Sequence, residues 1–114
     1  MKNKLTAIGL TLALLSGLSL PAKAQSPSES KLFVAYKLAN SRALGIVSTY
    51  NNNKIDTLLQ RSCVYIQQNY SLIASKAVLS RYFTVHKKME LGLAIDMADA
   101  FITTAHYMGC NSSV

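Results

Sequence analysis

The segment from Leu91 to Met108 constrains the fold most, because it is long, apolar and almost uncharged. Its only permanently charged side chains are two aspartates. At about 100° per residue, one narrow polar stripe runs along it, formed by Gly92, Asp96, Asp99, Thr103 and His106. A helix that is apolar around most of its surface is normally covered by other helices. We therefore expect a helix within residues 85–109 to be the central element of a helical bundle, with Gly109 at its C-terminal end.

An earlier amphipathic pattern predicts a first helix from Pro27 to Tyr50. Ser26 is expected to cap it, because Pro27 then occupies the first helical position and an acidic residue follows in the first turn. Tyr36 and Tyr50 fall on the apolar face of this helix, which favours a place in the core for both rings.

A second stripe follows an asparagine run and comprises Ile55, Leu59, Ser62, Ile66, Tyr70, Ile73 and Ala77. We expect Asn53 to cap this segment and Asp56 to lie at the third helical position, near the positive end of the helix dipole. The periodicity fits either one helix from Lys54 to about Arg81 or two helices broken near residues 69–71. The chain shows no strand alternation, hairpin turn or internal repeat. The predicted fold class is all-α, a small three- to four-helix bundle.

The N-terminal 24 residues have the three parts of a cleavable secretory signal peptide. Lys2 and Lys4 precede an apolar run over residues 5–18, and Ala22-Lys23-Ala24 places small residues at the two positions that a signal peptidase reads. The alternative, a membrane anchor, is less well supported because this run is shorter than the ~20 residues that a bilayer span needs. We predict cleavage before Gln25, a single mature domain over residues 25–114, and export to the bacterial periplasm or the extracellular space.

Both cysteines, Cys63 and Cys110, lie in the mature segment. In an oxidising compartment, two cysteines most simply form one intramolecular disulfide. An intermolecular bridge and free thiols are the alternatives. The bridge would join the end of the last helix to the middle of the second stripe, so we expect those two helices to pack side by side.

The charge of the mature chain is modest. Removal of Lys2, Lys4 and Lys23 with the leader lowers the net charge from +7 to +4. The remaining basic residues occur singly apart from Lys87-Lys88, without the basic run typical of nucleic-acid binding. We therefore expect no nucleic-acid partner.

The best candidate for a chemical site is the polar stripe of Asp96, Asp99, Thr103 and His106. Asp99 and His106 lie two turns apart, close to 10 Å by the helical rise, so they cannot share a metal ion on a straight helix. A hydrogen-bonded edge of a buried helix explains the stripe equally simply. The chain contains no nucleophile-elbow serine, phosphate-binding glycine loop or haem-attachment motif. We expect no enzymatic activity, metal or cofactor.

Three function classes stay open. The first is a small exported interaction protein, such as a binding, chaperone-like, inhibitor or immunity module, whose partner is another protein or a second copy of the chain. Tyr65 projects away from the second stripe and is the candidate interface residue. The second is a membrane-active, bacteriocin-like protein that uses the apolar helix over residues 91–108. The third is a small enzyme or metal-binding protein that uses Asp96, Asp99 and His106.

Overall fold

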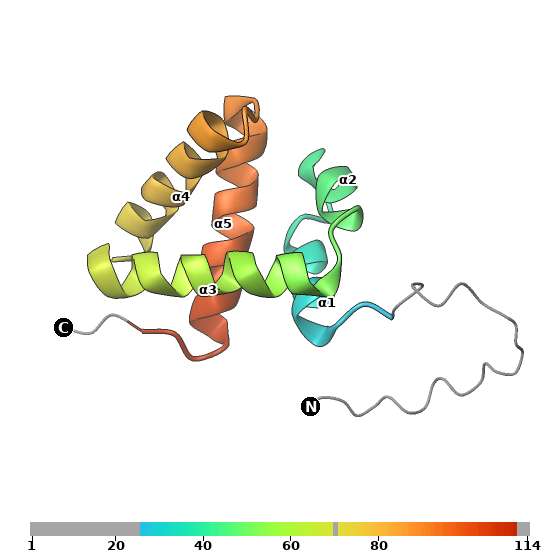
Figure 1. Ribbon diagram of the computed structural model, residues 1–114, viewed down its shortest axis with the longest axis horizontal. Coiled ribbons are helices and arrows are strands. Elements are labelled where there is room, and N and C mark those ends of the chain that lie inside the picture. Colours follow the sequence, from blue (N-terminus) through green and yellow to red (C-terminus); the bar gives the residue numbers. More distant parts are fainter. Residues whose placement is uncertain (1–25, 70, 112–114) are drawn as a thin grey trace, which may run out of the picture.

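The computed structural model describes residues 26–69 and 71–111, which form five α-helices (Figure 1). The helices are α1 (Glu29–Lys37), α2 (Ala43–Ser48), α3 (Asn52–Asn69), α4 (Leu72–His86) and α5 (Leu91–Tyr107). No strand occurs in this described part of the chain. The predicted all-α fold with one disulfide is therefore confirmed. The predicted signal peptide, residues 1–24, lies outside the described residues.

The single helix predicted over residues 27–50 is wrong, because the chain turns between α1 and α2. The amide of Leu38 donates back to carbonyls of α1, and the Ser41 hydroxyl accepts a hydrogen bond from the Ala43 amide at 3.0 Å. In an unbroken helix Leu38 would face solvent and Asn40 would face the core. The break reverses both, since Leu38 is 2% exposed and Asn40 is exposed.

This break also changes which face of α1 is buried. Val34 and Leu38 face the core, whereas Tyr36 is 75% exposed. The prediction of a core position for Tyr36 is therefore wrong, because it assumed a stripe that continued into α2. Tyr50 is half-buried and packs against the edge of the core.

The helix starts differ from the predicted ones by a few residues. Ser28, not Ser26, caps α1, and its hydroxyl accepts a hydrogen bond from the Lys31 amide. The side chain of Asn51, not Asn53, accepts one from the Lys54 amide at the start of α3. Asp56 consequently lies two residues further into α3 than predicted, beyond the first turn where the helix dipole acts most strongly.

The second stripe is divided between α3 and α4, which decides between the two alternatives left open by the sequence. Ser71 caps α4 by accepting a hydrogen bond from the Ala74 amide at 3.0 Å. The four stripe positions within α3, namely Ile55, Leu59, Ser62 and Ile66, are buried. Beyond the break the stripe no longer faces the core, and Ile73 is 81% exposed.

The connection between α4 and α5 is short and turns sharply. α4 continues to His86, and α5 begins at Leu91, where the predicted apolar segment of residues 91–108 begins. The Phe83 carbonyl accepts hydrogen bonds from the amides of Lys87 and Met89. Between these two amides Lys88 has φ +56°, a left-handed conformation that side chains other than glycine adopt at a cost.

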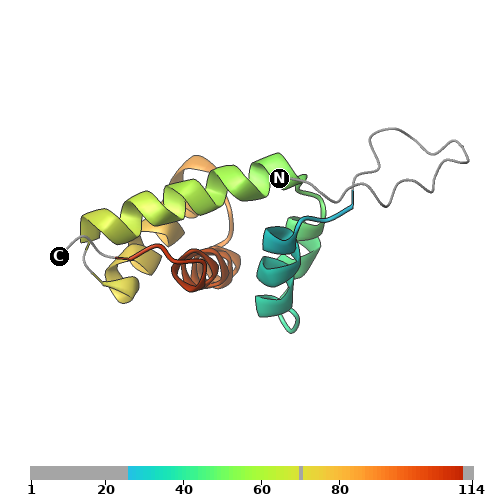
Figure 2. The same cartoon turned by 90° about the horizontal axis from the view of Figure 1, so that it is seen from below.

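The helix α5 lies at the centre of the molecule and contacts each of the other four helices. Figures 1 and 2 show α4 on one side of α5 and α1 and α2 on the other, while α3 crosses α5 and contacts α4 and α1. Ala94, Ala98 and Ala105 of α5 are buried, as their small size at a close helix approach predicts. Phe83 and Phe101 are fully buried with ring centroids 6.3 Å apart, so they fix the contact between α4 and α5.

The predicted disulfide between Cys63 of α3 and Cys110 is confirmed, with Cα atoms 5.6 Å apart. Gly109, with φ +106°, ends α5 as predicted. The Gly109 amide donates to the His106 carbonyl at 3.0 Å and the Cys110 amide to the Ala105 carbonyl at 3.1 Å, the paired bonds of a Schellman motif. This turn directs the chain from the end of α5 back to α3, where the bridge forms.

A span of the hydrocarbon core of a bilayer needs a helix of about 20 mainly apolar residues. Within residues 26–69 and 71–111, no helix is both long and apolar enough to cross a membrane.

Candidate functional site

The polar stripe of α5 does not converge on one point, because its members bind three different parts of the chain. The Ser41 hydroxyl, in the turn after α1, donates to Asp96 at 2.6 Å. Lys76 of α4 forms an ion pair with Asp99 at 2.8 Å. The Nδ1 atom of His106 lies 3.3 Å from the Cys110 carbonyl oxygen, and Thr103 is half-buried. Asp96 and Asp99 therefore tie α5 to the turn after α1 and to α4, whereas His106 contacts the segment that directly follows α5.

The described part of the chain also lacks a cluster of side chains that could bind a metal ion. Within it, no three side chains of histidine, cysteine, aspartate or glutamate lie close enough together to hold a metal ion.

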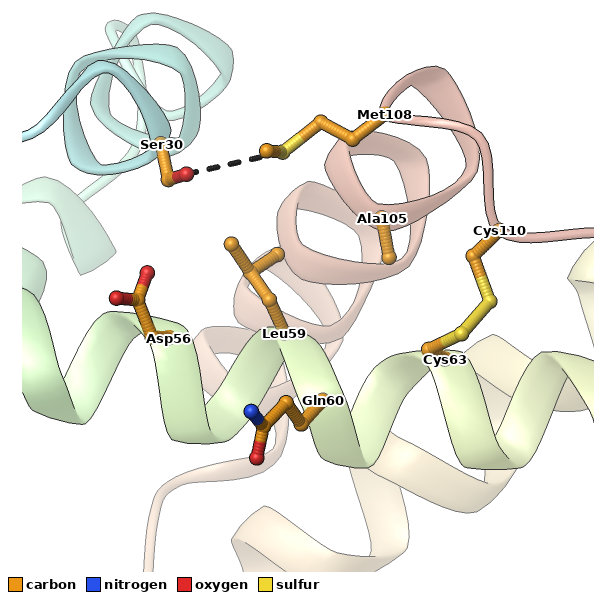
Figure 3. A pocket seen from close by; sticks show the side chains of 8 residues that line it. All are labelled: Ser30, Asp56, Leu59, Gln60, Cys63, Ala105, Met108 and Cys110. Atoms are coloured by element: carbon orange, nitrogen blue, oxygen red, sulfur yellow. Dashed lines mark hydrogen bonds between the residues drawn. A yellow bond between two sulfur atoms is a disulfide. The ribbon is translucent and has the colours of Figure 1, made fainter. Parts of the chain in front are cut away.

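A small pocket of about 320 Å³ lies beside the disulfide (Figure 3). The Cys63–Cys110 bridge lies at one end of it and Ser30 and Asp56 at the other, with Leu59 between them. The Ser30 hydroxyl donates to the Met108 sulfur at 3.8 Å, so the α1 side of this pocket is held by a weak contact. The polar side chains that line this pocket are Ser30, Asp56 and Gln60, which give it few groups with which to recognise a ligand.

A cluster of aromatic and basic side chains, built from α3 and α4, is the more distinctive feature. Arg61 is at its centre: its guanidinium carbon lies 4.0 Å from the centroid of the Tyr82 ring. The same guanidinium donates to the Tyr65 hydroxyl at 3.2 Å. Tyr65, the predicted interface residue, is half-buried and packs its ring against the core. Arg61 is therefore held by two tyrosines at once.

The Tyr82 ring also contacts two further basic side chains at the end of α4. The Lys87 ammonium lies 5.9 Å from its ring centroid, and the His86 ring centroid lies 5.4 Å away. A cation within about 6 Å of an aromatic face is attracted by the ring quadrupole. The Tyr82 ring is thus the common support for side chains from both helices.

Tyr50 and Lys54 extend the cluster towards the start of α3. The Lys54 ammonium lies 4.6 Å from the centroid of the Tyr50 ring. Burial, together with a smaller effect of the Tyr82 phenol, raises the pKa of the Tyr50 phenol. Lys54 precedes Arg61 by seven residues, about two turns of α3, so the two cations lie on the same face of that helix. We call the whole set the tyrosine–cation face: Tyr50, Lys54, Arg61, Tyr65, Tyr82, His86 and Lys87.

The carboxylates of the described chain lie elsewhere. Glu29 begins α1, and Glu90 is paired with Arg42 at 3.0 Å. Asp96 and Asp99 are on α5, where they bind Ser41 and Lys76. Asp56 follows Lys54 by two residues, so it points roughly 200° away around α3 and lines the disulfide pocket. The tyrosine–cation face therefore carries three permanent positive charges and no acidic residue of its own.

Tyr65 is the one member of this face that was predicted from the sequence as an interface residue. Three pairs at i and i+4 are visible in the sequence, Tyr50 with Lys54, Arg61 with Tyr65, and Tyr82 with His86. Each pair lies on one helix face or at a helix start, which is the signal that could have identified the cluster. That the pairs meet depends on the packing of α4 against α3, which no local pattern specifies.

No family model, curated protein or solved structure matches the chain. The fold defines a small all-α domain with one disulfide.

Proposed function

We propose that the chain is a small exported, non-enzymatic interaction protein that binds an acidic surface of another protein through the tyrosine–cation face. The observation that carries this proposal is the stack of Arg61, Lys87 and His86 on the Tyr82 ring. Tyrosine and arginine are among the residue types most enriched at protein interfaces and at their energetic hot spots. Because the rings already hold these side chains in place, binding would cost less side-chain entropy than for cations on an open surface.

The charge of the face supports an acidic partner. Lys54, Arg61 and Lys87 share it without an acidic neighbour among its members. Charge complementarity of this kind accelerates encounter with an oppositely charged surface and rejects like-charged ones. Burial of Arg61 against two tyrosines also lowers the effective dielectric around its charge, which strengthens its attraction to a carboxylate.

Export is supported by the disulfide, because such bridges persist in oxidising compartments. A binding, chaperone-like, inhibitor or immunity role would each fit this surface.

The membrane-active alternative required an exposed apolar α5, but α5 packs most of its apolar side chains against its neighbours. The enzymatic alternative required Asp96, Asp99 and His106 to converge, but these three bind separate elements. The burial of α5 and the separation of these three side chains both favour the interaction protein over the two alternatives.

The test uses the full chain with a C-terminal tag, expressed in a bacterial host and recovered from the exported fraction. Its mass should correspond to a mature form beginning at Gln25. A photo-crosslinking residue at position 65 should capture a protein of acidic pI, and capture should fall steeply when salt is raised.

Lys54→Glu and Arg61→Glu should each abolish that capture. Lys37→Glu, which makes the same change of charge on the exposed end of α1, is the matched control and should retain it. Equal capture by all three variants, or no capture by the native protein, would overturn the proposal. Retention of the mature protein on liposomes with leakage of their contents would instead support the membrane-active alternative.

A further inference from the structure

A second surface lies on the other side of α4, where α4 and α5 form a groove of about 690 Å³. Its apolar part comprises Ala77 of α4 with Leu91 and Ile95 of α5. Leu91 is 62% and Ile95 52% exposed, so two large aliphatic side chains next to each other on α5 are left in contact with water. Exposed apolar side chains gathered in one groove mark an interaction surface.

The charges of this groove are segregated by helix. Lys76 and Arg81 line its α4 wall, whereas Asp96 and Asp99 line its α5 wall. Within the described residues, Lys76 pairs with Asp99, but no hydrogen bond or ion pair engages the Arg81 guanidinium. Asp96 accepts one hydrogen bond from Ser41, and a carboxylate can accept about four. The groove thus offers an unpaired cation on one wall and a carboxylate with unused capacity on the other.

The heights of these groups along the groove also match. The Lys76–Asp99 ion pair sets one level, since α4 and α5 run antiparallel and these residues lie opposite each other. From that level, Arg81 lies five residues or about 7.5 Å along α4, and Asp96 lies three residues or about 4.5 Å in the same direction along α5. The remaining offset of about 3 Å along the groove is small compared with the reach of an arginine side chain.

We propose that this groove is occupied by a second copy of the chain, related by a two-fold axis that runs along the groove. That axis places α4 of each copy over α5 of the other and keeps every residue at its own level. Arg81 then faces the partner's Asp96, Lys76 faces the partner's Asp99, and the Leu91 and Ile95 pairs meet at the centre. A two-fold interface requires a self-complementary surface, and this groove has one. A uniformly acidic or basic partner would instead meet one wall of like charge.

This inference is independent of the tyrosine–cation face, because Tyr82 turns away from the groove and contacts Arg61 of α3. The dimer would leave that face open on both copies. The two proposals can therefore fail separately.

The test is sedimentation equilibrium of the exported protein over a range from low to high micromolar concentration. The native chain should change from the mass of one copy to that of two. Arg81→Asp and Asp96→Arg should each weaken dimerisation at least tenfold, because each places like charges opposite each other twice per dimer. An equimolar mixture of the two variants should dimerise again, since every contact in the mixed pair joins opposite charges.

This rescue also shows that both variants fold, because an unfolded chain would not restore the pair. Lys37→Asp, a matched charge reversal on α1, should leave the dimer unchanged, as should Lys54→Glu on the tyrosine–cation face. A native chain that stays monomeric throughout the range overturns the inference, and so does a mixture that fails to pair. If Arg81→Asp dimerises as the native chain does, the groove is not the interface.

Discussion

The guanidinium carbon of Arg61 lies 4.0 Å from the centroid of the Tyr82 ring, and this contact joins α3 to α4 at the surface of the molecule. Arg61 also donates to Tyr65 one turn further along α3. The residue that supports the proposed binding surface therefore also contributes to the packing of two helices.

We expect Arg61 and Tyr82 to be energetically coupled. In a double-mutant cycle with Arg61→Ala and Tyr82→Leu, measured by urea unfolding, the coupling free energy should be about 0.5–1 kcal/mol, the usual size for a partly exposed cation–π pair. The pair Lys37→Ala and Tyr82→Leu, whose side chains come from helices that share no described contact, should show none. Strict additivity of the Arg61 and Tyr82 changes would contradict this account of the face.

The left-handed conformation at the end of α5 should make Gly109→Ala destabilising by about 1 kcal/mol. The site has open space for a methyl group, so the cost arises from the backbone and not from a clash. Gly92→Ala is the matched change in the first turn of α5, where a methyl group would meet only the Glu90 carboxylate at 3.8 Å. It should stabilise the protein by about 0.5–1 kcal/mol, since alanine is the better helix former. Urea unfolding of both variants with the disulfide intact should give shifts of opposite sign.

Thr104 of α5 is fully buried, and its hydroxyl has no hydrogen-bond partner among the described residues. Thr104→Val replaces that hydroxyl by a methyl group of similar size. Because an unpaired buried polar group is costly, this variant should be more stable by about 1 kcal/mol. Thr103→Val, one residue along at a half-buried position, should change the stability much less. A less stable Thr104→Val variant would show that the hydroxyl is satisfied in solution.

Alkaline pH should destabilise the protein through Tyr50. Burial, with a smaller contribution from Tyr82, raises the pKa of Tyr50 above its ordinary value of 10.0. The folded chain then holds the phenolic proton more tightly than the unfolded chain, so this contribution to stability is complete below pH 10 and is lost as the pH rises through the folded pKa. The loss of unfolding free energy above pH 10 should be smaller in Tyr50→Phe than in the native protein. Tyr36→Phe, which alters an exposed ring, should retain the native loss.

The elements whose local pattern agrees with their tertiary contacts could be predicted from the sequence. The central helix, the end at Gly109 and the Cys63–Cys110 bridge are of this kind, whereas the periodicity left the break near residue 70 undecided. The division between α1 and α2 could not be predicted, because apolar spacing continues through it. What breaks the helix there is the burial of Leu38 against other helices together with the Ser41 cap.

The candidate site was predictable only to the level of one residue. Tyr65 could be recognised because it leaves the stripe of its own helix. Its connection to Tyr82 through Arg61 crosses from α3 to α4, and a pattern along one helix carries no information about such a contact. For the α5 aspartates the pattern along one helix was misleading. Asp96 and Asp99 share one stripe, but they bind different neighbours.

The disulfide closes a covalent loop that contains the second half of α3 and all of α4 and α5, whereas α1 and α2 lie outside it. In the chain-entropy model, closing a loop of this length lowers the entropy of the unfolded chain and so raises the free energy of unfolding by about 4 kcal/mol. The helices α1 and α2 are attached to α5 by noncovalent contacts, such as those of Ser41 with Asp96 and of Phe33 with Tyr107. We therefore expect two levels of resistance to opening. Amide hydrogens of α1 and α2 should exchange through local detachment, while those of α5 should exchange only when the whole looped unit unfolds.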